Sequence, residues 1–214
     1  MKKITVLLIL ACVSISFAQA TDNKYQEAML STIEALNAAT QNEEYQSCAN
    51  KFERIALAEK NLWLPYYYAS YACVLVSFNE ADPGRKDIIL DKAQLLLDSA
   101  FAKTTSESEL YVLQAFLYPS RIMVDPMTRG MIYVEKCFQS LETAKTLNPA
   151  NPRAYFLLGV MKLNIPESMG GGIEVAKACF MEAREKFLTF KAENPLMPLW
   201  GEEANNSELQ KLGL

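Results

Sequence analysis

A triplet of positions that returns four times is the feature that most constrains how this chain can fold. Each copy has a small residue, a large apolar residue four positions later and, in three of the copies, an alanine three positions after that. The copies are Cys48, Phe52, Ile55; Ala93, Leu97, Ala100; Cys137, Leu141, Ala144; and Ala176, Phe180, Ala183. Spacings of four and three place all three residues on one face of a helix. The third members lie 45, 44 and 39 residues apart, and this near-even spacing predicts an array of similar helical units.

A second pattern precedes each of the last three triplets and predicts the partner helix of each unit. It consists of a large residue four positions before a small one. The pairs are Tyr68 and Ala72, Tyr111 and Ala115, and Tyr155 and Gly159. A small residue lets a neighbouring helix approach closely. Because glycine costs about 1 kcal/mol inside a helix, Gly159 predicts tight packing at its position.

The best copy of the combined pattern resembles the tetratricopeptide repeat (TPR) family, whose helical hairpins stack into a superhelix. The residues that carry the resemblance are Tyr155, Leu158, Gly159, Ala176, Phe180 and Ala183, with Pro149 five positions after Ala144. Asn148-Pro149 is expected to end one hairpin and Asn151-Pro152 to begin the next, because proline suits the first helical turn and disfavours a helical residue before it. The family's period is about 34 residues, shorter than the period here, so other solenoids of paired helices stay open.

The expected fold is all-α. The resemblance implies a right-handed superhelix of about four TPR-like hairpins over residues 21–190, followed by a C-terminal capping segment over 191–214. Within that segment, four apolar residues are expected to cover the last helical pair: Leu196, Met197, Leu199 and Trp200. A terminal repeat otherwise leaves an apolar face bare. The alternative for Trp200 is a contact with a partner.

The length beyond the family's period is expected in three long connections inside the hairpins. They cover residues 77–86, 119–130 and 164–172, and equivalent loops of stacked repeats emerge on one edge, often the binding edge. Three arginines of this edge, Arg85, Arg121 and Arg129, are candidates for a small anionic ligand, because arginine offers a fork of donors to carboxylates. Alternatively, these arginines are solvated or pair with the nearby Asp82 and Asp125. The three glycines 170–172 lack a phosphate-binding signature and indicate a turn.

The first helices of TPR hairpins line a concave groove, and the resemblance implies which residues would face it. The candidate partner-binding residues are Tyr66, Glu109, Phe116, Arg153 and Phe156. A strip of mixed aromatic and charged side chains suits an extended peptide or a partner helix. The alternative is that these side chains pack against neighbouring units.

The first twenty residues are typical of a signal peptide. Lys2 and Lys3 precede an apolar run over residues 4–17, and small residues permit cleavage after Ala18 or Ala20. A lipoprotein signal that leaves Cys12 acylated is the alternative. The chain is therefore expected to be exported, to a periplasm or to the exterior, with no membrane-spanning segment after the signal.

Composition narrows the function further. The formal net charge is −4, and it becomes −6 without Lys2 and Lys3, which argues against a nucleic-acid partner. The chain has no histidine, the commonest general base and metal ligand, so no catalytic site, metal or cofactor is expected. The four cysteines after the signal, Cys48, Cys73, Cys137 and Cys179, match no metal motif and are expected to be buried thiols. Only Cys48 and Cys73 lie in adjoining units and could form a disulfide. The predicted function is a non-catalytic scaffold that binds a protein or peptide in its groove; the small-ligand binder is the alternative.

Overall fold

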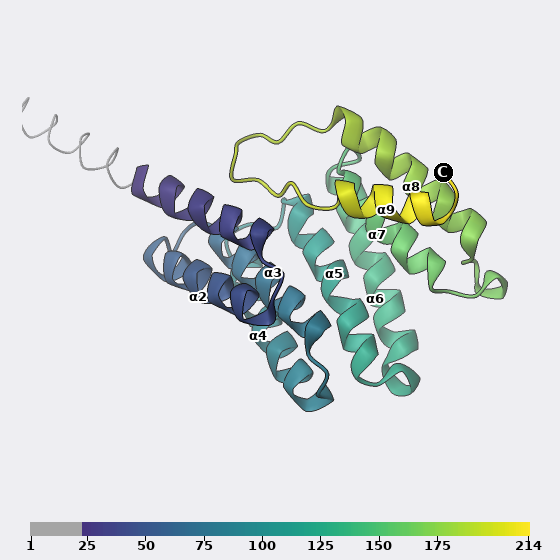
Figure 1. Cartoon of the computed structure of the whole chain (residues 1–214), viewed down its shortest axis with the longest axis horizontal. Coiled ribbons are helices and arrows are strands. Elements are labelled where there is room, and N and C mark those ends of the chain that lie inside the picture. The colour runs from purple at the N-terminus through teal and green to yellow at the C-terminus, as the bar shows by residue number, and fades with distance from the viewer. Residues whose placement is uncertain (1–22) are drawn as a thin grey trace, which may run out of the picture.

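A computed structural model describes residues 23–214 as helices joined by mostly short connections (Figure 1). No strand occurs among these residues, so the prediction of an all-α fold is confirmed. The predicted signal peptide and Cys12 lie outside the described residues. The helices are 23–38, α2 (Asn42–Ala58), α3 (Leu64–Asn79), α4 (Pro83–Phe101), α5 (Ser108–Val124), α6 (Pro126–Leu147), α7 (Pro152–Leu163), the short 3-10 helix η1 (Glu167–Met169), α8 (Ile173–Thr189) and α9 (Glu202–Lys211).

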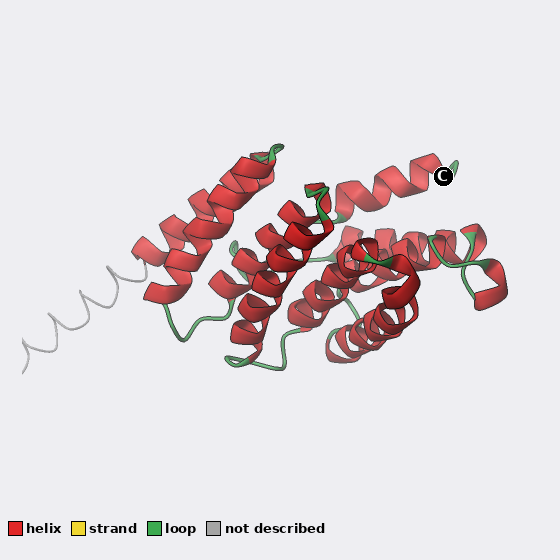
Figure 2. Cartoon of the chain, turned by 90° about the horizontal axis from the view of Figure 1, so that it is seen from below, coloured by secondary structure: helices red, strands yellow, loops and turns green. Residues whose placement is uncertain are grey.

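Successive helices pack as hairpins. Helix α3 packs against α4, α5 against α6 and α7 against α8, while α2 lies on α3; Figure 2 shows helix 23–38 beside α2 at one end of the row. The large apolar residue of every triplet is fully buried in the second helix of its pair: Phe52, Leu97, Leu141 and Phe180. Burying one such side chain contributes about 1.5–3 kcal/mol. The recurring stripe therefore forms the core, as predicted.

Gly159 shows the tight packing that its place in a helix predicts. A Cβ atom added to Gly159 would lie 2.6 Å from the ring of Phe180. Alanine at this position would therefore push against a fully buried ring. The cost of glycine in α7 is offset by the close approach of α8.

The two Asn-Pro pairs form the joint between α6 and α7. Asn148 is the C-terminal cap of α6, and the Asn151 side chain accepts a hydrogen bond from the backbone N–H of Arg153 at the start of α7, with Pro152 in the first turn. Asn151 is fully buried, and its amide also donates to Ser108 Oγ (3.0 Å) and Glu109 Oε1 (2.8 Å). The joint therefore also ties α7 to the start of α5.

Two of the three expected long connections are absent. Residues 80–82 alone join α3 to α4, and Asp125 alone joins α5 to α6. The side chains of Asp82 and Asp125 accept hydrogen bonds from the backbone N–H groups of Arg85 and Thr128, so each Asp-Pro caps a helix. Pro119 lies inside α5. The extra length therefore extends the helices, and of the three expected loops only residues 164–172 form a long connection.

The cysteines are free thiols in the described part of the chain. Cys48, Cys73 and Cys137 are buried and Cys179 is half-buried. Burial raises the pKa of the Cys137 thiol to about 12. The interpretation as buried thiols holds for three of the four. Within residues 23–214, no helix is both long and apolar enough to cross a membrane.

Candidate functional site

The segment between α8 and α9, residues 190–201, packs on the first helices of the hairpins, α3, α5 and α7, whose shared face we call the concave face. The Trp200 ring stacks on Tyr71 of α3 with 5.2 Å between centroids and lies 5.3 Å from Phe116 of α5. Its Nε1 donates to the Tyr67 hydroxyl (2.9 Å), and the Tyr68 hydroxyl donates to the Leu196 carbonyl (2.9 Å). Figure 1 shows this segment looping away from α8 before α9 returns beside it.

Helix α9 covers the last pair. The Asn205 amide donates to the Phe180 carbonyl at 3.1 Å, and Leu209 is buried. The apolar residues expected to cover this pair divide between the two cores: Trp200 packs against the C-terminal core, and Met197 packs against the N-terminal core. Leu196 is buried against the N-terminal core, whereas Leu199 is exposed. The apolar face of α8 is covered by a short helix whose sequence is largely polar.

The predicted partner-binding residues lie beneath or beside that segment. Glu109, Arg153 and Phe156 are buried, and Tyr66 and Phe116 are half-buried. The Arg153 guanidinium forms an ion pair with Glu109 (Nη2 to Oε1, 2.7 Å), its Nε lies 3.1 and 3.0 Å from the two Glu109 oxygens, and its Nη1 donates to the Trp200 carbonyl at 3.3 Å. The charged groups of the predicted strip are therefore bound by the chain's own residues, whereas Tyr66 and Phe116 keep partial exposure.

The three candidate arginines of the hairpin edge are only partly brought together. Arg121 Nη1 lies 3.0 Å and Arg129 Nη1 2.6 Å from Asp87 Oδ1, and Arg121 Nη2 lies 2.6 Å from Asp91. Hydrogen bonding from Arg129 and Arg121 lowers the pKa of Asp87, against the opposing effect of burial. Arg85 is exposed and stands apart from this cluster. The carboxylates of α4 thus neutralise two of the arginines, in place of the expected Asp82 and Asp125.

An apolar groove opens at the same edge, between α6 and the connection from α7 to α8. We call it the edge groove; its volume is about 940 Å³. Its lining residues are Ile122, Gly130, Met131, Val134, Glu135, Phe138, Gln139, Glu142, Thr143, Asn164, Ile165, Pro166 and Met169. Met131 and Met169 remain 76% and 61% exposed. Exposed apolar patches of this kind mark binding sites.

Charged groups stand at the borders of the edge groove. Lys162 Nζ lies 4.9 Å from the centroid of the Phe138 ring and donates to the Gly170 carbonyl at 2.8 Å. Glu142 pairs with Lys145 at 2.9 Å, and Glu135 accepts from the Gln139 amide at 3.2 Å. The groove therefore has an apolar interior, with positively and negatively charged groups at its border.

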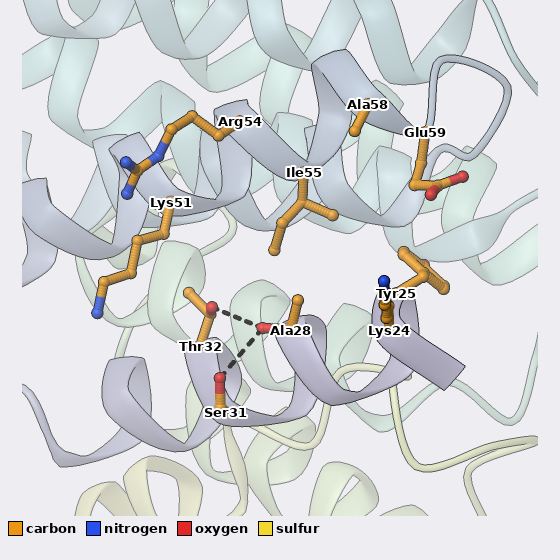
Figure 3. A pocket seen from close by; sticks show the side chains of 10 residues that line it. All are labelled: Lys24, Tyr25, Ala28, Ser31, Thr32, Lys51, Arg54, Ile55, Ala58 and Glu59. Carbon is orange, nitrogen blue, oxygen red and sulfur yellow. Dashed lines mark hydrogen bonds between the residues drawn. The ribbon is translucent and has the colours of Figure 1, made fainter. Parts of the chain in front are cut away.

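A second cavity lies between helix 23–38 and α2, and its volume is about 450 Å³ (Figure 3). Lys24, Lys51 and Arg54 surround an apolar floor that includes Ile55. The hydroxyls of Ser31 and Thr32 both donate to the Ala28 carbonyl, at 3.4 and 2.7 Å. The carboxylate of Glu59 also lines this cavity, so its border carries charges of both signs. The cavity has about half the volume of the edge groove.

Sequence reasoning identified the hairpin edge but missed the edge groove. The available signal is the pair Met127 and Met131, one helical turn apart and both exposed on α6. This spacing indicates a helix face only if residue 127 is helical, whereas residues 119–130 were predicted to be a loop. No cluster of three or more histidine, cysteine, aspartate or glutamate side chains that could hold a metal ion occurs within residues 23–214.

Comparison with known proteins supports the fold. No protein-family model matches the chain, and no curated protein matches it. Among solved structures, the HusA haemophore from Porphyromonas gingivalis is similar with a TM-score of 0.79 and 29% sequence identity, over 88% of this chain and 92% of HusA. A thermophilic TPR protein from Thermus thermophilus shares the fold with a TM-score of 0.54 and 17% identity, over 92% of this chain and 96% of that one. The chain has a TPR-like helical fold.

Proposed function

We propose that this chain is an exported, non-catalytic protein that binds a flat apolar ligand of the haem class in the edge groove. The observation that carries the proposal is a groove of about 940 Å³ with an apolar interior. The chain that forms it is similar in structure to a haemophore and shares 29% sequence identity with it. A haemophore is named for carrying haem. Ligand sites commonly have volumes of about 300–1,000 Å³ and mostly apolar walls, so the edge groove is of suitable size.

The walls of the groove match the chemistry of a porphyrin ring. Val134, Phe138 and Ile165 present aliphatic and aromatic surface, and burial of apolar area contributes about 25 cal/mol per Å². The acidic side groups of such a ligand would be repelled by Glu135 and Glu142. They would therefore turn toward Lys162 beside Phe138 and toward solvent.

The arrangement of polar groups supports binding rather than catalysis. The two carboxylates of the groove, Glu135 and Glu142, both project from α6 and do not face each other across the groove. Acid–base catalysis needs titratable groups that converge on a reacting atom. The groove thus presents surface for recognition, and the predicted signal peptide over residues 1–20 would deliver it outside the cytoplasm.

Titration with haemin tests the proposal. The wild-type protein should give a saturable shift of the Soret band, and Met131→Glu should abolish or strongly weaken it, because a carboxylate would enter the apolar wall. Leu188→Glu makes a similar change at a 70% exposed site of α8 outside the groove and should bind as the wild type does. Equal binding by both variants would place the ligand elsewhere, and no binding by the wild type would reject the haem class.

Binding of a peptide on the concave face is a second candidate function. It is favoured by the way in which that face holds residues 190–201 through Tyr67, Tyr68 and Arg153. If the face accepts peptides, a synthetic peptide of residues 190–201 should bind to Trp200→Ala, in which the chain's own segment is loosened, and not to the wild type. Failure to bind either protein counts against this function.

A further inference from the structure

Two methionines, Met131 and Met169, line the edge groove, and the sequence leaves few other iron donors there. Met131 belongs to α6, and Met169 is the last residue of η1 in the connection between α7 and α8. Resting on the proposed function, we infer that Met131 and Met169 supply thioether ligands to the iron of a bound haem, one from α6 and one from η1.

The side chains that proteins usually offer to haem iron are histidine, cysteine, methionine and tyrosine. The chain has no histidine. No cysteine and no tyrosine lines the edge groove. Among the usual donors, the groove therefore offers only the two methionine sulfurs.

Both sulfurs belong to side chains that are free to meet a ligand. Met131 and Met169 are 76% and 61% exposed, so neither is committed to the core. Because they come from two separate elements, α6 and η1, both thioethers would be available to hold the iron of a haem bound in the groove.

The connection that carries Met169 is held in place by its glycines. Gly170 has a φ of 78°, and a Cβ atom on Gly171 would overlap the Ile165 carbonyl. The Gly172 N–H donates to the Lys162 carbonyl at 2.9 Å, and Lys162 Nζ returns to the Gly170 carbonyl. The three consecutive glycines thus fold the loop back onto the end of α7 and fix the base of the Met169 wall.

Carboxylate ligation by Glu135 or Glu142 is the competing arrangement, and iron oxidation state separates the two. Thioethers are soft donors and favour the reduced metal, whereas carboxylates are hard. Methionine ligation also raises the reduction potential of haem. The inference therefore predicts a low-spin, six-coordinate spectrum for the ferrous complex.

The test replaces sulfur by carbon at nearly constant volume in the full mature chain. Met131→Leu, Met169→Leu and the double variant keep the apolar walls, since leucine and methionine are close in size. Met127→Leu is the control: it lies one turn before Met131, is 93% exposed and does not line the groove. The ligand is haemin, reduced with dithionite after binding.

Each single variant should lose the low-spin ferrous bands, the double variant should be high-spin, and the reduction potential should fall in the same order. Met127→Leu should match the wild type in all of these, and metal-free protoporphyrin should bind the double variant as tightly as the wild type. If haem binds but the double variant keeps the wild-type spectrum and potential, the inference is overturned while the proposed function stands. If the wild-type protein binds neither haem nor protoporphyrin, both fail together.

Discussion

The concave face and the edge groove are both rich in large side chains, but the chain fills only the first. On the concave face, the ring of Trp200 packs against those of Tyr71 and Phe116, and its carbonyl accepts a hydrogen bond from Arg153. In the edge groove, Met131 and Met169 remain mostly exposed. Residues that a repeat pattern assigns to recognition therefore serve the fold here, and the surface left for a ligand is the one that lacks such a pattern.

The difference predicts opposite responses to substitution. Changes on the concave face should cost stability, because its polar groups are buried and satisfied by the chain itself. Changes in the edge groove should cost binding and leave stability almost untouched.

Removing Glu109 should have the largest effect on stability. Glu109→Leu leaves the Arg153 charge buried without its partner, and loss of one member of a buried pair costs about 3–5 kcal/mol. Chemical denaturation measures the change in the free energy of unfolding. The double variant Glu109→Leu/Arg153→Met should recover most of the loss, since neither charge is then buried. A loss below about 1 kcal/mol in the single variant would contradict the account of the concave face.

Trp200→Ala should be the next most damaging change. It removes ring contacts with two helices and the hydrogen bond to the Tyr67 hydroxyl. We expect the free energy of unfolding to fall by about 2–3 kcal/mol. This is at or below the lower end of the usual cost of truncating a buried tryptophan, because the Trp200 side chain is only half-buried. Leu199→Ala, at an exposed site one residue earlier, is the matched control and should be nearly neutral. Equal thermal midpoints for the two variants would show that the segment does not hold the face.

Cys137→Ala concerns the core beneath both surfaces. Alanine already fills the equivalent triplet position at Ala93 and Ala176, so the variant should lose no more than about 1 kcal/mol. Burial raises the Cys137 pKa to about 12, so the native thiol should resist alkylation at neutral pH until the protein unfolds. Non-reducing mass mapping provides the control: a link between Cys48 and Cys137 within one chain would refute the stacked arrangement, because residues two units apart do not touch.

Met131→Glu should change the free energy of unfolding by less than about 0.5 kcal/mol, as is usual for exposed sites. The same variant is expected to lose haem binding. One substitution would thus remove binding and leave the stability of the protein almost unchanged. A large loss of stability in this variant would mean that the methionine serves the fold, and the contrast between the two surfaces would fail.

The Asp87 cluster at the hairpin edge should give a small effect that depends on pH. Its pairing with Arg129 and Arg121 lowers the Asp87 pKa, so this pairing adds stability above the unfolded pKa of about 3.9 and loses it as the pH falls through the lower folded value. Asp87→Asn should therefore be less stable than the wild type at neutral pH, with a gap that closes in acid. Added salt should reduce the gap, because the pairs are partly solvated. A gap that is independent of pH would contradict this assignment.

Much of the fold follows from local sequence, because the stripe of Phe52, Leu97, Leu141 and Phe180 and the joint at Asn151 depend on short spacings. The two missing loops were mispredicted because Asp-Pro suits both a turn and a helix start. The place of residues 190–201 depends on contacts such as Tyr68 with Leu196, 128 residues apart. No local pattern encodes such a contact. The edge groove arises where α6 meets the connection over residues 164–169, which spacing along one helix does not show.

Hydrogen exchange with and without bound haemin tests the central contrast most directly. Backbone amides slow when a ligand stabilises the segment that contains them. The account predicts added protection in α6 over residues 130–143 and in the connection over residues 164–169, with unchanged exchange in residues 190–201. Protection or release confined to residues 190–201, with α6 unchanged, would place the ligand on the concave face and contradict the assignment of the edge groove.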